Sequence, residues 1–347
     1  MRLWKNKQFW GTIIAVALLA FCVKDIRLSE LRVLSERLSI GYLLPAVACT
    51  FLFVLTKTFR WKLMISHKKK LSAGRVIGLY SAGQILNIVM PALTGQVGRM
   101  ILFARREGLR KTFVFSTIIL EILFDAISLV VLLLATSVAF VFPDEYRYMS
   151  YVIASVTLAV LIGLYLMLHY QTGLEDFGRR RLRDRWPGMH VAFKKFIRSF
   201  TKGIESLRSS QHFFGSLFLS FLSWTAHMLV VYFLLKSFGY SLPIAAAASV
   251  VIINTLALMV PVTPANAGTF EVAVSTSLAA FSVARSDAVL FAVALHILDL
   301  LPIVALGLGF VRSERAAIKQ IKSENVDKSF LDEINDESVA YEGEVKP

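Results

Sequence analysis

The chain has 347 residues, of which 56% are hydrophobic, and a formal net charge of +14. Its mean hydropathy of +0.63 excludes an ordinary soluble domain and indicates an integral membrane protein. The two cysteines, Cys22 and Cys49, indicate no disulfide framework and show no metal-ligand spacing. Because the Lys and Arg residues flank apolar stretches, we expect them to mark membrane sidedness rather than to bind nucleic acid.

Apolar stretches of about 20 residues, long enough to cross a hydrocarbon core of about 30 Å, recur along the chain. The first has charged flanks but lacks a small-residue cleavage signature, so we expect a retained helix rather than a signal peptide. We predict six full transmembrane helices, near residues 8–23, 39–59, 113–140, 149–169, 213–237 and 285–311.

Two further apolar segments, 74–105 and 242–282, are interrupted in a similar way. The first interruption reads N-x3-P-x3-G-x3-R from Asn87 to Arg99, and the second reads TPANAG-x2-E from Thr263 to Glu271. Each segment is long enough for two half-length helices. Paired Pro/Gly interruptions in corresponding halves of a membrane protein indicate a transport site. Two ordinary Pro-kinked hairpins with a coincidental similarity are the alternative.

The placement of Lys and Arg residues tests how these two segments enter the membrane. A single crossing by either segment would put one of the basic stretches 60–75, 105–111 or 179–208 on the outer side. If each segment instead returns to its own side and both termini are cytoplasmic, the basic residues outside are Lys24, Arg27, Arg32, Arg37, Arg147, Lys236 and Arg285. We therefore predict an all-α polytopic fold with two inverted re-entrant helix hairpins, in repeats near 39–169 and 213–311.

The membrane domain is predicted to span residues 1–311, with a basic cytoplasmic loop at 170–212. Apolar residues from Phe193 to Leu207 recur there at helical spacing, which indicates an amphipathic helix on the anionic inner leaflet. Such a helix serves either lipid recruitment or anchoring and topology. Residues 312–347 form an acidic tail with few apolar anchors, which we predict to be disordered.

Charged side chains inside the predicted membrane segments are informative, since each costs about 2.5–3.5 kcal/mol at a helix centre. Glu121 and Asp125 are four residues apart on one helix face and repel each other. They require a cation, a shared proton or water, and Arg99 is a candidate partner. Structural ion pairing is the alternative to a functional role.

His296 and Asp299 are three residues apart in the last predicted helix. They could bond to each other, and His296 could relay protons or contact a headgroup. Asp299 could instead bond to the backbone groups freed before Pro302.

The interruptions offer polar groups of a second kind. A half-helix that begins after Pro91 or Pro264 has unpaired backbone N–H groups, where the helix dipole favours an anion. Asn and Thr side chains nearby could hydrogen-bond a headgroup or satisfy the broken backbone. The candidate substrate-binding residues are Asn87, Thr94, Gly95, Arg99, Glu121, Asp125, Thr263, Asn266, Gly268, Glu271, His296 and Asp299.

Four patches together resemble a known family. They are Arg60-Trp61, Asn87-x3-Pro91-x3-Gly95-x3-Arg99, Glu121-x3-Asp125 in part, and Thr263-Pro264-x3-Gly268-x2-Glu271. In these the chain resembles the flippase-like, lysylphosphatidylglycerol synthase transmembrane-region family. It departs from the family pattern at Gln96, at Ala265-Asn266, and at His296 and Asp299, so the resemblance does not imply a particular lipid. We expect a stand-alone member without an aminoacyltransferase domain.

The resemblance and the buried charges imply a transporter that moves an anionic lipid, of phospholipid or polyprenyl-phosphate type, across the bacterial inner membrane. No ATP-binding motif is present, so movement would be downhill or coupled to a proton or cation. The sequence contains no catalytic motif and implies no cofactor, and we expect no enzyme activity. A non-transporting scaffold or regulator of an envelope lipid or glycan enzyme is the alternative, and the oligomeric state is left open.

Overall fold

The computed structural model describes residues 38–66, 68–89, 94–139, 210–258 and 263–313, with isolated residues between 155 and 180. Within these ranges the chain forms eight α-helices and one short 3-10 helix, and no strand, which confirms the predicted all-α class for this part of the chain. The elements are α3 (Ile40–Ile65), α4 (Ala73–Val89), α5 (Thr94–Glu107), α6 (Lys111–Ala139), α10 (Ser210–Ser237), α11 (Ile244–Ala257), η2 (Pro264–Asn266), α12 (Thr269–Ala279) and α13 (Arg285–Ser313).

Four helices in the described ranges are long and apolar enough to cross a membrane. They cover Ile40–Ile65, Phe113–Leu132, Gln211–Ser237 and Arg285–Phe310, and they coincide with four of the six predicted spans. The chain is therefore a multi-pass membrane protein. The predicted spans near 8–23 and 149–169 lie outside the described residues, apart from isolated positions in the latter.

The two interrupted segments each form two short helices, as predicted. α4 and α5 occupy the segment at 74–105, and α11 and α12 occupy the segment at 242–282. Residues 90–93 and 259–262, which include Pro91 and Pro261, lie outside the described residues. The same order of long, short, short and long helices therefore occurs twice along the chain.

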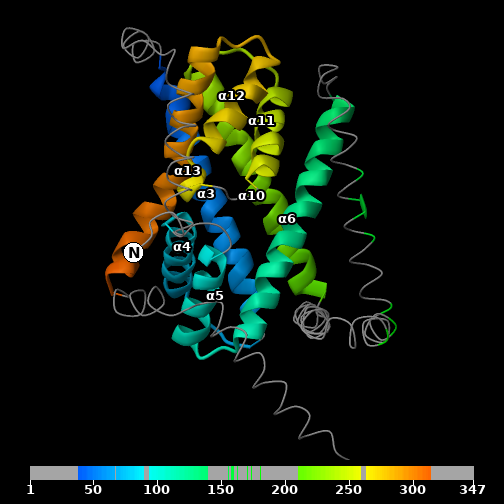
Figure 1. Ribbon diagram of the computed structural model, residues 1–347, viewed down its shortest axis with the longest axis vertical. Coiled ribbons are helices and arrows are strands. Elements are labelled where there is room, and N and C mark those ends of the chain that lie inside the picture. Colours follow the sequence, from blue (N-terminus) through cyan, green and yellow to red (C-terminus); the bar gives the residue numbers. More distant parts are fainter. Residues whose placement is uncertain are drawn as a thin grey trace, which may run out of the picture.

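The two short pairs lie at opposite ends of the long helices (Figure 1). This follows from the antiparallel packing of α3 against α10. At one end the Ser39 N–H donates to the Ser237 carbonyl at 2.9 Å, and at the other end the Ser66 Oγ lies 3.2 Å from His212 Nε2. α4 follows the end of α3 that lies beside the start of α10, whereas α11 follows the end of α10 that lies beside the start of α3. The two halves therefore run in opposite directions.

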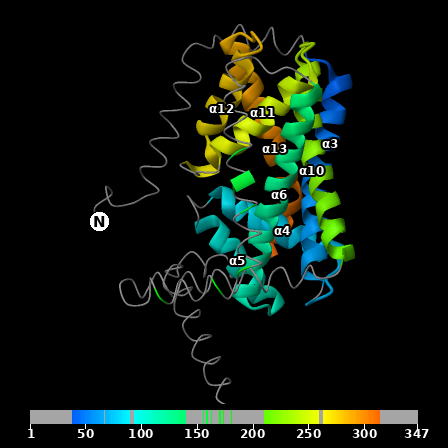
Figure 2. The ribbon, with the colours of Figure 1, turned by 90° about the vertical axis from the view of Figure 1, so that its right-hand side faces the viewer.

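The interrupted segments also meet between the two ends. η2 packs against α4, and α13 packs along α4. In Figure 2 the pair α11 and α12 lies above the pair α4 and α5. The second interruption therefore touches the short pair of the first half, and this contact places the candidate residues of both halves inside one bundle.

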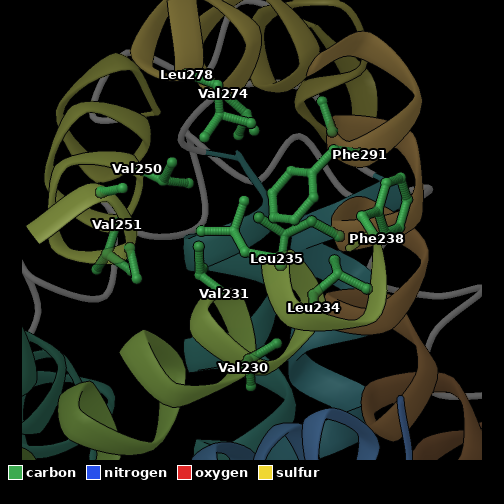
Figure 3. Packing of buried hydrophobic residues seen from close by; sticks show 14 of the residues in the cluster. Val230, Val231, Leu234, Leu235, Phe238, Val250, Val251, Val274, Leu278 and Phe291 are labelled. Carbon is green, nitrogen blue, oxygen red and sulfur yellow. The ribbon is translucent and has the colours of Figure 1, made fainter. Parts of the chain in front are cut away.

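Each short pair is held by its own apolar core. Around α11 and α12, buried Val, Leu and Phe side chains of α10, α11, α12 and α13 fill the space, including Leu235, Val250, Val274 and Phe291 (Figure 3). Around α4 and α5, a second cluster contains Trp61, Leu79 and Phe103. Each short pair therefore has an apolar core of its own, and α13 connects the two cores by packing along α4.

α4 and α13 approach closely through a small residue. A Cβ atom on Gly307 would lie 2.6 Å from Ile85 Cδ1 and 3.1 Å from the backbone carbon of Ser81. Small residues at such contacts let membrane helices pack backbone against backbone.

The loop and tail predictions fall mostly outside the described part of the chain. α10 begins at Ser210 and α13 continues to Ser313, a few residues beyond the predicted boundaries. The predicted amphipathic helix and the acidic residues from 314 onward lie outside the described residues.

Replacing Gly307 with Val is expected to destabilise the protein by about 1–3 kcal/mol, because the added methyl groups overpack the contact with α4. The measurement is thermal unfolding of the purified protein in detergent micelles. Gly309→Val, on the same helix, is the matched control, because a Cβ there meets no atom within 4 Å. Equal unfolding midpoints for the two variants would contradict the close contact between α4 and α13.

Candidate functional site

Five charged side chains from three helices meet inside the bundle. α3 supplies Lys57 and Arg60, α5 supplies Arg99, and α6 supplies Glu121 and Asp125. Residues three or four apart lie on one face of a helix, which explains how α3 presents two cations to the two acids of α6. We call these five residues the charged cluster.

Glu121 is the centre of the charged cluster. Its carboxylate accepts hydrogen bonds from Arg99 Nη2 and from the Tyr80 hydroxyl, the latter at 2.9 Å. Arg60 Nη2 lies 3.6 Å from Glu121 Oε1. The predicted pairing of Arg99 with Glu121 is therefore present, and Tyr80 of α4 adds a neutral donor.

Asp125 is held by different donors. Its carboxylate accepts from Arg60 Nη1 at 2.5 Å, from Lys57 Nζ at 3.1 Å and from Trp224 Nε1 at 3.0 Å. Ser220 Oγ lies 2.6 Å from the same Arg60 nitrogen. Because Trp224 and Ser220 belong to α10, these contacts tie the charged cluster of the first half to the second half.

The charged cluster has more cations than carboxylates, and most of it is shielded from solvent. The side chains of Arg60 and Arg99 are 1% and 2% exposed, whereas those of Lys57 and Asp125 are 15% and 19% exposed. Among the described residues, Arg60 Nε, Arg60 Nη2 and Arg99 Nε have no hydrogen-bond partner. Buried N–H groups of this kind are rare and favour an added acceptor.

The second interruption forms a left-handed turn, which we call the 263–268 turn. Ala265, Asn266 and Gly268 have φ angles of 53°, 56° and 84°. For residues with a side chain this conformation is unfavourable and persists only when neighbouring contacts hold it. Thr263 holds both ends of the turn, since its carbonyl accepts from Asn266 N–H at 3.0 Å and its hydroxyl donates to the Ala267 carbonyl at 2.8 Å.

Glu271 and His296 fasten this turn to α13. Glu271 Oε2 accepts from Gly268 N–H at 2.6 Å, and Glu271 Oε1 lies 2.7 Å from His296 Nδ1. His296 Nε2 lies 3.1 Å from the Ala265 carbonyl oxygen, and the Phe270 ring stacks on the imidazole with centroids 4.3 Å apart. The N–H group expected to receive a substrate anion at the start of α12 is thus occupied by Glu271 itself.

His296 and Asp299, which could have bonded to each other, have different partners. Asp299 is instead paired with His227 of α10, whose Nε2 lies 3.2 Å and 3.3 Å from the two carboxylate oxygens. The Phe53 ring of α3 stacks on this imidazole at 4.5 Å. The carboxylate of Asp299 therefore joins α13 to α10.

The remaining predicted residues lie at the ends of short helices. Asn87 is half-buried in the last turn of α4, and Thr94 and Gly95 begin α5. Nothing in the described contacts joins Asn87 to the charged cluster. No group of three or more His, Cys, Asp or Glu side chains in the described ranges is arranged to hold a metal ion.

Five residues at the site were not singled out as candidates from the sequence: Lys57, Arg60, Tyr80, Trp224 and His227. Lys57 and Arg60 carried a usable signal, because cations three residues apart on an apolar helix match the i, i+4 acids of another helix. Their position near the end of a span made them resemble border residues.

Replacing Glu121 with Gln is expected to cost about 3–5 kcal/mol of stability, since it leaves Arg99 buried without its counter-charge, whereas Arg60 keeps Asp125. Glu107→Gln is the matched control. Glu107 is also buried, but its partners Lys69 and Arg75 have side chains 42% and 39% exposed and stay hydrated, so the expected loss is about 0–1 kcal/mol. Chemical unfolding in micelles measures both. A similar loss in the two variants would show that burial of the arginines does not set the cost.

The fold and the site together define a class: an all-α multi-pass membrane protein with a buried ionic site between two interrupted helix pairs. A family model described as the lysylphosphatidylglycerol synthase TM region matches residues 8–307. The match covers most of the chain, so the chain belongs to this family and the resemblance found in the sequence is confirmed. Searches of curated proteins and of solved structures gave no match.

Proposed function

We propose that this protein moves an anionic lipid, of phospholipid or polyprenyl-phosphate type, across the bacterial inner membrane without ATP. The observation that carries the proposal is the charged cluster, in which Arg60, Arg99 and Glu121 are buried between helices while Lys57 and Asp125 stay partly exposed. Membership of a membrane family named for a lipid synthase supports a lipid-related role.

The free-energy cost of placing the charged cluster in the membrane supports a role in ligand binding rather than in structure alone. A charge at a helix centre costs about 2.5–3.5 kcal/mol on insertion scales, and a buried ion pair is often no more stabilising than apolar residues of similar volume. A stable bundle therefore does not require five such charges. The net positive charge and the unpartnered N–H groups of Arg60 and Arg99 fit a phosphate, which guanidinium groups bind with two parallel hydrogen bonds.

Lys57 is the point at which a headgroup would first reach the charged cluster. Its side chain is partly exposed, and its ammonium lies over the rings of Phe53 and Trp224 at 4.7 Å and 4.6 Å. A lipid phosphate that approaches along α3 would meet Lys57 before it meets the guanidinium groups of Arg60 and Arg99. The acyl or prenyl tails would stay in the bilayer.

The inverted arrangement supports movement rather than static binding. The two short pairs extend from opposite ends of the long helices and meet where η2 contacts α4 (Figure 1). In transporters with inverted repeats, the site at the repeat interface opens to each side in turn. From hydropathy and the placement of Lys and Arg residues we also infer six spans, two re-entrant pairs and cytoplasmic termini.

The test is lipid movement by the full chain in proteoliposomes that contain fluorescent anionic or zwitterionic phospholipids, with dithionite quenching to report the exposed leaflet. Wild-type protein should accelerate movement of the anionic lipid. Arg99→Ala and Glu271→Ala should each slow it by about tenfold or more, as expected for the loss of a charged contact of about 1.5–3 kcal/mol. Lys57→Met keeps the buried pairs intact and should also slow movement.

Lys236→Ala is the control, because Lys236 lies over the Tyr232 ring in the last turn of α10, away from the charged cluster. It should behave as wild type. Wild-type rates for Arg99→Ala, Glu271→Ala and Lys57→Met together would overturn the assignment of the site. The absence of any movement by folded wild-type protein, with each lipid class tried, would overturn the proposed function.

A further inference from the structure

His296 is held between two acceptors. Its Nδ1 lies 2.7 Å from Glu271 Oε1, and its Nε2 lies 3.1 Å from the Ala265 carbonyl oxygen. A backbone carbonyl can only accept a hydrogen bond, so Nε2 must carry a proton and donate it. A neutral imidazole has one N–H group, and that group is now used.

The contact between His296 and Glu271 therefore requires one more proton. It lies either on Nδ1, which gives an imidazolium beside a carboxylate, or on Glu271 Oε1, which gives a carboxylic acid beside a neutral ring. Both placements give the pair zero net charge. The Gly268 N–H that donates to Glu271 Oε2 at 2.6 Å is a contact typical of a carboxylate, which favours the imidazolium.

His227 of α10 differs in this respect. His227 contacts Asp299 through Nε2 alone, and its Nδ1 has no hydrogen-bond partner among the described residues. One N–H group satisfies that contact, so a neutral ring beside a carboxylate is sufficient. The pairs His296–Glu271 and His227–Asp299 are thus similar in composition. Of the two, the pair at the second interruption is the one whose contacts require an additional proton.

We propose that His296 and Glu271 form a proton-binding site, and that the bound proton fastens the 263–268 turn to α13. When the proton leaves to water, Glu271 is a carboxylate and His296 has a single N–H group. That N–H group can donate either to Glu271 or to the Ala265 carbonyl. At the other contact, a lone pair of the ring nitrogen then faces a lone pair of the oxygen. Ala265 loses its tie to α13, or Glu271 loses its tie to His296.

No other charged group described here competes for His296. α12 brings Glu271, and the neighbouring acid on α13, Asp299, is bound to His227 of α10. Farther along the bundle, the cations of α3 and the tyrosine of α4 are engaged with α6, in the contacts of Lys57 and Arg60 with Asp125 and of Tyr80 with Glu121.

The proton would act on the place where the two halves meet. η2 lies within the 263–268 turn and packs against α4, the helix that carries Tyr80 of the charged cluster. Fastening or releasing the turn therefore changes the contact between the second interruption and the first short pair. As a step in transport, this coupling rests on the proposed function; the proton binding itself does not.

The direct test is ring-nitrogen NMR of the full chain, labelled with ¹⁵N-histidine and reconstituted in lipid nanodiscs. At about pH 6, within the range where histidines bind protons, both His296 nitrogens should give signals of protonated nitrogen, or of strongly shared protons. The signals are assigned by their loss in His296→Gln. An unprotonated His296 nitrogen beside an ionised Glu271, read from the ¹³C shift of its carboxyl group, throughout the pH range of the folded protein would overturn the proposal.

A second measurement separates proton binding from a merely structural role. Hydrogen exchange of the peptide at 263–271, corrected for the intrinsic effect of pH, should rise by about tenfold in wild type as pH increases and the proton leaves. Glu271→Gln should remove this pH dependence and keep the turn protected, because the amide N–H replaces the bound proton and the amide oxygen still accepts from Gly268. His296→Gln should leave the turn unprotected at every pH.

His227→Gln is the matched control and should keep the wild-type pH dependence. Identical pH profiles for wild type and Glu271→Gln would overturn the proposal. In proteoliposomes, a pH gradient should change the rate of lipid movement by wild type and not by Glu271→Gln. If wild type moves no lipid, the proposed function fails while the NMR and exchange results still decide the proton site. If it moves lipid but responds to the gradient as Glu271→Gln does, the coupling fails.

Discussion

The need to neutralise charges inside an apolar bundle governs this structure. Glu121 is buried on α6 and is compatible with that position because donors from α3, α4 and α5 converge on its carboxylate. Asp125, one turn further along α6, accepts a hydrogen bond from Trp224 of α10 and so connects the two halves. Removing a single counter-charge would leave a buried charge uncompensated, which is far more costly than the net worth of any one pair. The short helices α4 and α5 are therefore fixed by ionic contacts as well as by their apolar core.

The second half meets the same constraint in a different way. The start of α12 has N–H groups without helical partners, and Glu271 supplies the acceptor for one of them. His296 then compensates Glu271 and reaches the left-handed turn at Ala265. The first interruption thus lies beside a site with permanent cations, whereas the second is closed by a histidine that can gain or lose its charge. An anionic headgroup and a coupling proton would use these two unequal sites, which the contact between η2 and α4 links.

Hydropathy and the Pro/Gly interruptions were sufficient to predict the four described long helices and the two short pairs, because both depend on local sequence. The pairing of Arg99 with Glu121 was also predictable, since an intramembrane acid needs a cation. Other partners were not. His296 and Asp299 lie on adjacent turns of α13 but face Glu271 of α12 and His227 of α10, because helix rotation depends on packing against neighbours. Lys57 and Arg60 were not predicted as site residues, because the position of a residue along a span does not show which face of the helix its neighbours cover.

We propose that the charged cluster receives the phosphate of a lipid. The most direct measurement is a high-resolution structure of the protein purified with native lipid, together with native mass spectrometry of the lipid that stays bound. The account predicts an anionic lipid whose phosphate oxygens lie within hydrogen-bond distance of Arg60 or Arg99, with Lys57 at the entrance to the site. A bound lipid whose phosphate stays at the membrane surface, while Arg60 and Arg99 keep all their contacts with Glu121 and Asp125, would contradict the account.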